Sequence, residues 1–406
     1  MDPHSALSTL FTPAGRDNPY PVFAALRSSA PVHHDAELDT YVLTRFADCR
    51  YALGDPALLV PDLDWYARQD PGWHEHPGAD FFYSSLLRRN GADHGRLRRL
   101  VAGAFSVRRV QALRAGVGNL ADGFLDSFAD ACAAGGTADF QALVGYPLPV
   151  AVVGRLIGVP AGEQPDFQRL GHDAGRLLEP LRTARDWDLA DRAVDTLRAY
   201  FAELVRRRRA EPADDLTTDL LRARDADDTR LDERELVDTL LLVLVAGYET
   251  TAGLLGLAVH ALLTHPDQWR KLRERPALVP RAVEEAMRWD TPVQMTERIA
   301  ARALVIGGVP VPAGANVTTV LAAAHRDPER HPEPDAFRVD RADVKVLGFG
   351  GGAHYCLGAA LARLETAELL ERLLIRFPTL SLAGGALRRT SISLRAFDVL
   401  PLSAHG

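Results

Sequence analysis

The most regular pattern of apolar positions lies near the C-terminal end of the chain. Residues 344–377 run from a short β-branched segment through a glycine-rich loop into an amphipathic helix, with Leu357, Leu361 and Leu364 spaced four and three residues apart on one face. Cys356 therefore lies at or just before a helix N-terminus, where unpaired N–H groups and the helix dipole favour a thiolate over a thiol. We interpret this cysteine as a nucleophile, a redox thiol or a metal ligand.

A second apolar segment, residues 236–263, is long enough to cross a membrane. Asp238, Glu249 and His260 fall within it, and charged groups inside a bilayer are costly. Apolar residues on all sides also fit the central helix of a large globular fold. We expect such a core helix and no membrane span.

The remaining pattern is mostly helical. Residues 57–92 are rich in aromatic side chains and show no clear period, which indicates an irregular loop. Residues 107–230 have helical patterns, and residues 299–320 alternate as short strands do. Residues 20–56 predict a helix, two strands and a second helix, at Tyr20–Ala30, Val32–His34, Thr40–Thr44 and Phe46–Leu53.

Composition and charge exclude several classes of protein. The chain has 406 residues, 47% apolar and 25% charged, as ordinary globular proteins do, and no Gly/Ser-rich or Pro-rich linker divides it. A net charge of −7 argues against general nucleic-acid binding. The start of the chain lacks the basic and apolar regions of a signal peptide. Cys49, Cys132 and Cys356 form no close-spaced pair and leave an odd count, so we expect the reduced cytoplasm.

Gly348, Gly350 and Ala353 also fit G-x-G-x-x-A, the dinucleotide-binding fingerprint. That interpretation needs an acidic residue after a second parallel strand, about 20 residues further on. Glu368 and Glu371 have about this spacing, but the pattern places both inside the helix, and too little chain follows for a doubly wound sheet. The other alternative, an inert buried cysteine, leaves the residues around Cys356 unexplained.

Those residues form the pattern F-x-x-G-x-H-x-C-x-G, which comprises Phe349, Gly352, His354, Cys356 and Gly358. The pattern resembles the haem-binding signature of the cytochromes P-450, the haem-thiolate monooxygenases, in which a cysteine thiolate ligates haem b. The resemblance implies that Cys356 ligates the iron and that Phe349 shields the sulfur. Gly350 and the other glycines let the loop approach the porphyrin, and His354 reaches a haem propionate.

Two further motifs of this family contribute polar groups. His94 and Arg98 form an H-x-x-x-R pair on one helix face, which holds a propionate in the family. Ala246, Gly247, Glu249 and Thr250 resemble the oxygen-activation motif, whose small pair leaves room for dioxygen and whose acid and alcohol deliver protons. The structural alternative for Thr250 is a hydroxyl that bonds back to a helix carbonyl.

Glu285 and Arg288 match the family's E-x-x-R ion pair, which is a structural element. In the family, a third partner of this pair usually comes from the segment 334–337, where arginine is frequent at the position of Ala336. We therefore expect Arg326 to take the place of this third partner. Arg298 matches the place of another propionate-binding arginine.

The resemblance covers about residues 18–402 and implies a mainly α fold with minor β-sheets, in one haem-containing domain over residues 1–406. Its β-rich part is expected at about 30–60 and 292–320, and its helical part at about 90–290 and 356–378. The residues expected to line the substrate pocket are Phe82, Leu242, Val245, Val293 and Ile392.

The function implied is that of a cytoplasmic, monomeric monooxygenase that hydroxylates or epoxidises an apolar small molecule with dioxygen and two electrons. A ferredoxin and its reductase would bring these electrons from NAD(P)H. High Ala, Arg and Gly usage resembles actinobacterial proteins, many of whose relatives tailor polyketides or macrolides. The alternatives are a peroxide-driven haem-thiolate enzyme acting on fatty acids and a non-enzymatic haem-thiolate sensor.

Overall fold

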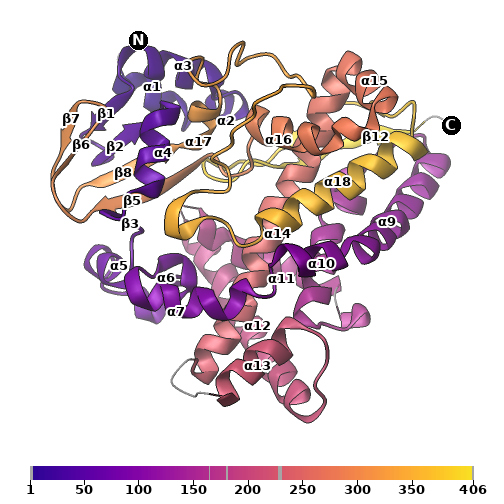
Figure 1. The fold of residues 1–406 in the computed structure, drawn as a ribbon, viewed down its shortest axis with the longest axis horizontal. Helices are drawn as coiled ribbons and strands as arrows, with labels where there is room; N and C mark the ends of the chain where they lie inside the picture. The colour runs from indigo at the N-terminus through magenta and orange to yellow at the C-terminus, as the bar shows by residue number, and fades with distance from the viewer. Residues whose placement is uncertain (1–2, 164, 180–181, 227–230, 405–406) are drawn as a thin grey trace.

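The computed structural model describes residues 3–163, 165–179, 182–226 and 231–404, most of them helical. The helices surround α14, which runs through the middle of the molecule, and the main sheet lies at one side (Figure 1). The expected mainly α fold is confirmed. The α-helices are α1 (Pro3–Thr9), α2 (Pro13–Asp17), α3 (Tyr20–Ser29), α4 (Phe46–Gly54), α5 (Leu63–Gln69), α6 (Pro77–Ser84), α7 (Gly91–Ala102), α8 (Val107–Ala112), α9 (Arg114–Gly135), α10 (Pro147–Ile157), α11 (Pro165–Gly175), α12 (Ala184–Ala210), α13 (Leu216–Ala226), α14 (Glu233–Thr264), α15 (Pro266–Glu274), α16 (Val279–Trp289), α17 (Leu321–His325) and α18 (Ala359–Arg376). Short helical turns of other types are η1 (Trp73–Glu75), η2 (Leu86–Arg88), η3 (Gln141–Gly145), η4 (Ala161–Glu163), η5 (Arg176–Leu178), η7 (Pro276–Leu278) and η8 (Gly352–His354).

The main sheet joins two distant parts of the chain. Its strand order is β1-β2-β8-β5-β3, and β2 runs parallel to β8, with Thr40 opposite Asn316 and Leu43 opposite Thr319. Its strands are β1 (Val32–Asp35), β2 (Thr40–Leu43), β3 (Leu58–Leu59), β5 (Met295–Ala300) and β8 (Asn316–Val320), all inside the ranges expected for the β-rich part. The smaller sheets contain β4 (Ala138–Asp139), β6 (Leu304–Ile306), β7 (Val309–Val311), β9 (Ser381–Leu382), β10 (Leu387–Arg388), β11 (Phe397–Val399) and β12 (Pro401–Ser403).

α14 begins with a capping box. The Asp232 side chain accepts a hydrogen bond from the Glu235 N–H (2.7 Å), and the Glu235 side chain accepts one from the Asp232 N–H (3.2 Å), which satisfies donors that the first helical turn leaves free. In the described part of the chain, α14 is the one helix long and apolar enough to cross a membrane, and most of it is buried inside the protein. Its burial agrees with the expected core helix.

The prediction that residues 57–92 form an irregular loop is wrong, because α5, α6, η1 and η2 lie in this range. The Asp62 side chain caps α5 by accepting a hydrogen bond from the Trp65 N–H (3.0 Å), and Pro77 occupies the first position of α6, where its missing N–H costs nothing. The Tyr66 and Tyr83 rings of the two helices stack at 3.8 Å. Such short helices span too few turns for apolar residues to recur at helical spacing, so the pattern of apolar and polar positions did not indicate them.

α11 packs closely on α14. A Cβ atom at Gly171 would lie 3.0 Å from the Tyr248 ring, and one at Gly175 would lie 2.9 Å from Glu249 Cγ. Glycines four residues apart share a helix face, so α11 presents bare backbone to α14 at this crossing. This contact brings α11 next to the segment of α14 that carries Glu249 and Thr250.

Candidate active site

Cys356 lies in a tight loop that joins residues 344–349 to α18. Gly350 and Gly352 have φ angles of 72° and 59°, in the left-handed region that glycine adopts without strain. A Cβ atom at Gly352 would lie 2.6 Å from the carbonyl oxygen of Leu53, so the loop also packs closely on the end of α4. The Cys356 N–H donates to the Phe349 carbonyl (2.8 Å), which fixes the backbone on the N-terminal side of the sulfur.

Cys356 precedes the N-terminus of α18, as predicted. The helix begins at Ala359, so Leu357 lies outside it and is only half-buried, whereas Leu361 and Leu364 are buried on its inner face. The prediction that all three leucines share one helix face is therefore wrong for Leu357. The amphipathic pattern extended two residues beyond the point where helical geometry starts.

The Cys356 side chain is accessible, whereas the other two cysteines are buried. Desolvation by the surrounding protein raises the pKa of the Cys356 thiol, although the N–H groups of Gly358 and Ala359 and the charges of Arg98 and Arg363 lower it. The N–H groups at the helix terminus thus act in the predicted direction, but desolvation outweighs them. Bonding to a metal ion deprotonates a thiol outright.

The residues predicted to hold propionates come together beside this loop. His94 and Arg98 lie on α7, Arg298 lies on β5, and His354 lies on η8. The His94 and His354 rings are 4.1 Å apart, and Arg98 Nη2 donates to the Tyr355 carbonyl (2.5 Å). Burial and the neighbouring cationic groups lower the pKa of His354 to about 3, so this imidazole is neutral.

This group of side chains is positively charged and lacks a counter-ion. Arg298 is 4% exposed and donates to the Glu297 carbonyl (2.7 Å), yet neither Arg298 nor Arg98 forms an ion pair with any carboxylate in the described residues. Burial and the charge of Arg88 lower the pKa of Arg298 to about 10. A buried charge requires a partner, so the arrangement suits a bound anion. Arg88 was not predicted, because no motif includes it.

The residues present therefore fit a haem. Its propionates would neutralise the cations, and Cys356 would supply an accessible sulfur. Among the described residues, no group of three or more His, Cys, Asp or Glu side chains could bind a metal ion by itself.

Thr250 donates a hydrogen bond to the Ala246 carbonyl (2.9 Å), which is the structural alternative considered for this hydroxyl. Thr250 and Ala246 are both half-buried. A Cβ atom at Gly247 would lie 2.8 Å from Val153 Cγ2 on α10. The missing side chain at Gly247 is thus explained by the packing of α10 on α14, whereas the sequence-based expectation assigned it to dioxygen.

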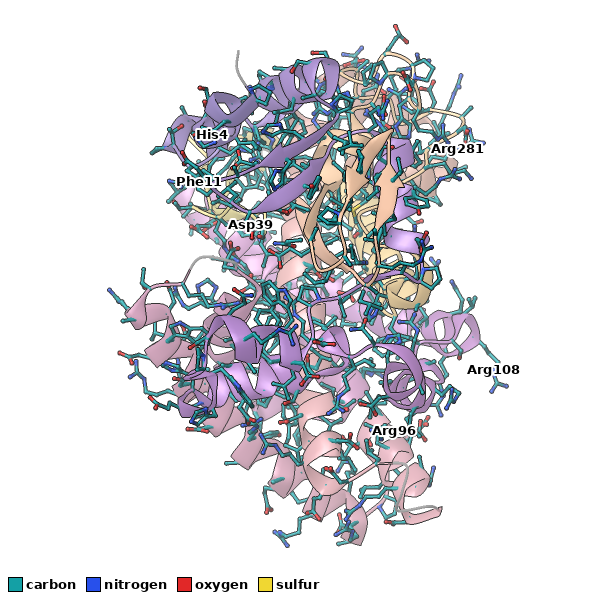
Figure 2. The ribbon with its side chains drawn as sticks, turned by 90° about the vertical axis from the view of Figure 1, so that its left-hand side faces the viewer. His4, Phe11, Asp39, Arg96, Arg108 and Arg281 are labelled. Atoms are coloured by element: carbon teal, nitrogen blue, oxygen red, sulfur yellow. The ribbon has the colours of Figure 1, made fainter. Side chains whose placement is uncertain are left out.

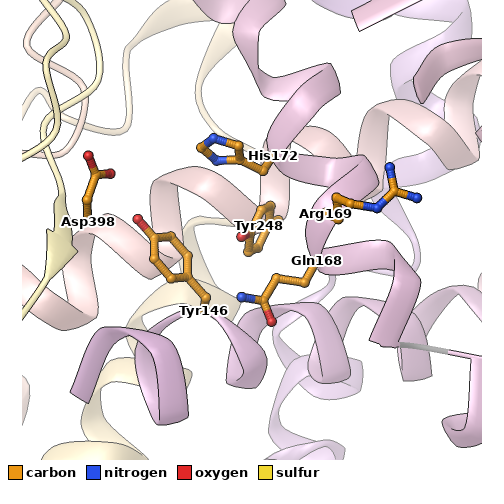
Figure 3. A pocket seen from close by; sticks show the side chains of 6 residues that line it. All are labelled: Tyr146, Gln168, Arg169, His172, Tyr248 and Asp398. Atoms are coloured by element: carbon orange, nitrogen blue, oxygen red, sulfur yellow. The ribbon is translucent and has the colours of Figure 1, made fainter. Parts of the chain in front are cut away.

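Glu249 is 3% exposed and is held by two partners that the sequence did not indicate. Its carboxylate contacts His172 Nδ1 (3.0 Å) on α11 and the Arg389 guanidinium near the C-terminus. Burial alone would raise the pKa of Glu249, but the His172 hydrogen bond and the Arg389 charge outweigh it and hold the pKa below its usual value. His172 also lines an open pocket of about 320 Å³ with Tyr146, Gln168, Arg169, Tyr248 and Asp398 (Figure 3).

The Glu285–Arg288 ion pair is fully buried, with Arg288 Nε donating to Glu285 Oε2 (2.7 Å). Its third partner is Arg341, whose Nε lies 3.0 Å from Glu285 Oε2. The substitute that we considered, Arg326, instead binds Asp335 (2.9 Å), so that prediction is wrong. Ala336 contributes through its backbone, because its carbonyl accepts from Arg288 Nη2 (3.0 Å) and Arg341 Nη2 (2.8 Å).

This network supports the start of the cysteine loop. Arg288 Nη1 donates to the His325 carbonyl (3.3 Å), and the His325 imidazole accepts from the Leu347 N–H (2.7 Å). Burial lowers the pKa of His325 to about 3, so the ring stays neutral and its Nε2 remains an acceptor. The Leu347 carbonyl then accepts from the Gly350 N–H (2.7 Å). The buried ion pair is therefore connected to the turn that carries Cys356.

The residues predicted to line the pocket fall into two groups. Phe82, Leu242 and Val245 are all buried and belong to the large apolar core of the helical part. Val293 forms an antiparallel bridge with Leu394 and so lies beside the loop that contains the half-buried Ile392. The loops around 293 and 392 are thus neighbours, as a shared pocket wall requires.

The basic run at 108–114 is largely neutralised. Arg109 and Arg114 form ion pairs with Asp219 and Glu368, while Arg108 is exposed and points away from the molecule (Figure 2). Arg108 is thus the one arginine of these three that forms no ion pair in the described part of the chain.

The chain resembles known proteins over most of its length. The family model described as Cytochrome P450 matches residues 57–390. The chain is 37% identical to a vitamin D(3) 25-hydroxylase of Pseudonocardia autotrophica, covering 97% of this chain and 96% of the relative. It is 35% identical to a 6-deoxyerythronolide B hydroxylase of Saccharopolyspora erythraea, and the match covers 95% of this chain and 96% of that relative. The solved structure of P450BioI in complex with an acyl carrier protein superposes with a TM-score of 0.89 at 30% identity, over 96% of this chain and 99% of that one.

Proposed function

The chain belongs to the cytochrome P450 family, and we propose that this monooxygenase hydroxylates or epoxidises an apolar secondary metabolite of the polyketide or macrolide kind. The two relatives are named as hydroxylases of vitamin D3 and of 6-deoxyerythronolide B, which supports a bulky apolar substrate. Electrons would come from NAD(P)H through a ferredoxin and its reductase. We expect a monomeric enzyme in the cytoplasm.

The convergence of an accessible cysteine with Arg98 and the buried Arg298, neither paired with a carboxylate among the described residues, carries this proposal. Cys356 Sγ would hold the haem iron, and His94, Arg98, Arg298 and His354 would hold the propionates. When bound, the haem supplies the activation of dioxygen. The protein positions the ligand loop through the Glu285 network described above, and it excludes water by burying the apolar cluster around α14.

Protons would reach the site from the side of α14 that carries Glu249 and Thr250. His172 has a side-chain exposure of 39% and contacts the almost fully buried Glu249. It would take a proton from solvent and pass it to the Glu249 carboxylate. The hydroxyl of Thr250, the next residue, would deliver a proton after its hydrogen bond to the Ala246 carbonyl is released. Such positioned proton transfer contributes about 10²–10⁴-fold to the rate.

A carbon monoxide difference spectrum of the reduced protein tests the assignment of the haem ligand. We expect the Soret band of a thiolate-ligated haem in the wild type and its loss in Cys356→Ser, because an alcohol does not replace the thiolate as a donor. Cys132→Ser is the matched control, since this cysteine is buried away from the site, and it should keep the band. A wild type without this band would contradict the proposal.

The Thr250→Ala variant tests the proton-delivering role. Haem content and substrate affinity should stay unchanged, while a larger share of the NAD(P)H consumed should appear as hydrogen peroxide. Unchanged coupling of NAD(P)H consumption to product would show that Thr250 has only its helix-bonding role.

A peroxide-driven enzyme would turn over without ferredoxin, and a sensor would bind haem but consume no NAD(P)H with any ligand.

A further inference from the structure

Two arginines flank one aromatic ring where α6 and η2 meet the segment that precedes α12. The Arg88 guanidinium carbon lies 4.6 Å from the centre of the Phe82 ring and 5.2 Å from that of Tyr66. The Arg182 guanidinium carbon lies 5.9 Å from the Phe82 ring and 4.8 Å from the Trp187 ring. Stacking on aromatic faces holds a guanidinium in place and leaves its N–H edges free to bind a ligand.

Neither arginine has an acidic partner. In the described part of the chain, no carboxylate lies within ion-pair distance of either guanidinium, and both Nε–H groups are buried without a hydrogen-bond partner. Arg182 donates only from its outer nitrogens, to the Leu177 carbonyl (2.8 Å) and to the Tyr83 hydroxyl. Arg198, at the same contact of α6 with α12, is bound by Asp80 and Asp238. The two unpaired cations therefore differ from their neighbour in lacking a counter-charge.

We propose that Arg88 and Arg182 bind a carboxylate group of the substrate. This inference rests on the proposed function, since Phe82, on which both arginines stack, is one of the residues expected to line the substrate pocket. Phe82 belongs to the buried apolar cluster that also includes Leu242 and Val245 of α14. A ligand with its acid group between the arginines would direct its apolar part along this cluster. The substrate is thus an apolar molecule that carries an acidic group.

A haem propionate is the other source of a carboxylate. Arg88 is near enough to Arg298 and His354 to lower their pKa values. The two sources therefore make different predictions. A substrate site needs both arginines for ligand affinity and neither for haem retention. A propionate site needs Arg88 for haem retention.

The experiment compares dodecanoate with dodecanamide, which has the same length and no charge, by calorimetric titration of the haem-loaded protein. We expect dodecanoate to bind more than about tenfold more tightly at low salt, because a hydrogen bond to a charged group is worth about one factor of ten or more in affinity. Arg88→Gln and Arg182→Gln should each lower dodecanoate affinity about tenfold without changing that of the amide. Arg68→Gln is the matched control, because this arginine is exposed on α5 nearby.

Three results would overturn the proposal. One is equal affinity of the wild type for acid and amide, including failure of both to bind. Another is an equal loss of dodecanoate affinity in Arg68→Gln, which would indicate general charge attraction. The third is faster transfer of haem to apomyoglobin in Arg88→Gln with unchanged dodecanoate affinity, which would assign Arg88 to a propionate. The carbon monoxide spectrum, recorded on every variant, separates these outcomes from a failure of the haem-thiolate assignment itself.

Discussion

Replacing Arg341 by methionine tests the buried ion-pair network around Glu285. The change removes the Nε–H that Glu285 accepts (3.0 Å) and the donors that bind the carbonyls of Pro332 (2.6 Å), Glu333 (3.1 Å) and Ala336 (2.8 Å). Glu285 keeps Arg288, so the loss should fall near the lower limit for breaking a buried ion pair, about 3 kcal/mol of the free energy of unfolding.

Arg338→Gln is the matched control, three residues away. Its ion pair with Glu333 (2.7 Å) is exposed, with side-chain exposures of 47% and 69%, and such pairs contribute less than about 1 kcal/mol. Urea denaturation at equal haem content, followed by circular dichroism, measures both changes. Arg341→Lys, which keeps the charge but loses the planar fork, should be intermediate.

The position of the network predicts a second effect. Because Arg288 and His325 connect it to the Leu347 turn, Arg341→Met should also speed haem loss to apomyoglobin, whereas Arg338→Gln should not. Equal losses of stability in Arg341→Met and Arg338→Gln would refute the reasoning that burial gives Arg341 its importance. Normal haem retention in a destabilised Arg341→Met variant would refute only the connection to the cysteine loop.

Three other changes have outcomes that the structure predicts. Gly247→Ala should lower the free energy of unfolding by about 1–3 kcal/mol through overpacking, since its Cβ would lie 2.8 Å from Val153 Cγ2. In a double-mutant cycle, adding Val153→Ala to this variant should restore most of the lost stability. His325 has a pKa of about 3 in the folded protein against about 6.5 in the unfolded chain. Its contribution to the free energy of unfolding is therefore complete above pH 6.5 and falls by about 1.4 kcal/mol per pH unit as the pH drops toward 3. The free energy of unfolding of His325→Gln, measured by urea denaturation, should fall less steeply with pH over this range. Gly352→Ala should lower haem occupancy, measured by the pyridine haemochrome, because the residue has φ 59° and its Cβ would lie 2.6 Å from the Leu53 carbonyl; full occupancy would contradict the tight packing of the loop on α4.

Features carried by neighbouring residues could be predicted from the sequence. The helix predicted at Tyr20–Ala30 is observed at Tyr20–Ser29, and the two strands and the helix that follow deviate by one residue at their ends. The Glu285–Arg288 pair was also predictable, since its members lie one helical turn apart. In each case the residues that determine the structure lie within a few positions of one another.

Partners that are distant in the sequence could not be predicted. His172 and Arg389 meet at Glu249 from positions 77 and 140 residues away, and no spacing rule relates such residues. Arg341 was missed as the third partner of Glu285, because no motif includes it and the sequence offered Arg326; only the fold shows that Arg341 binds Glu285 and Arg326 binds Asp335. The net direction of the Cys356 pKa could not be predicted for a similar reason, because the surrounding protein desolvates the sulfur more than the helix terminus stabilises its charge.

The parallel pairing of β2 with β8 has a consequence for synthesis of the chain. The Thr40 and Thr318 hydroxyls that meet across these strands (3.0 Å) are 278 residues apart. At about 5–20 residues per second, a ribosome needs about 14–56 s to make the segment between them. During that time β1 and β2 can pair with each other, but the other edge of β2 stays open, and open edges associate with other chains. Slower expression at low temperature prolongs this exposure, so a chaperone that covers nascent strands should improve the soluble yield more than cooling does.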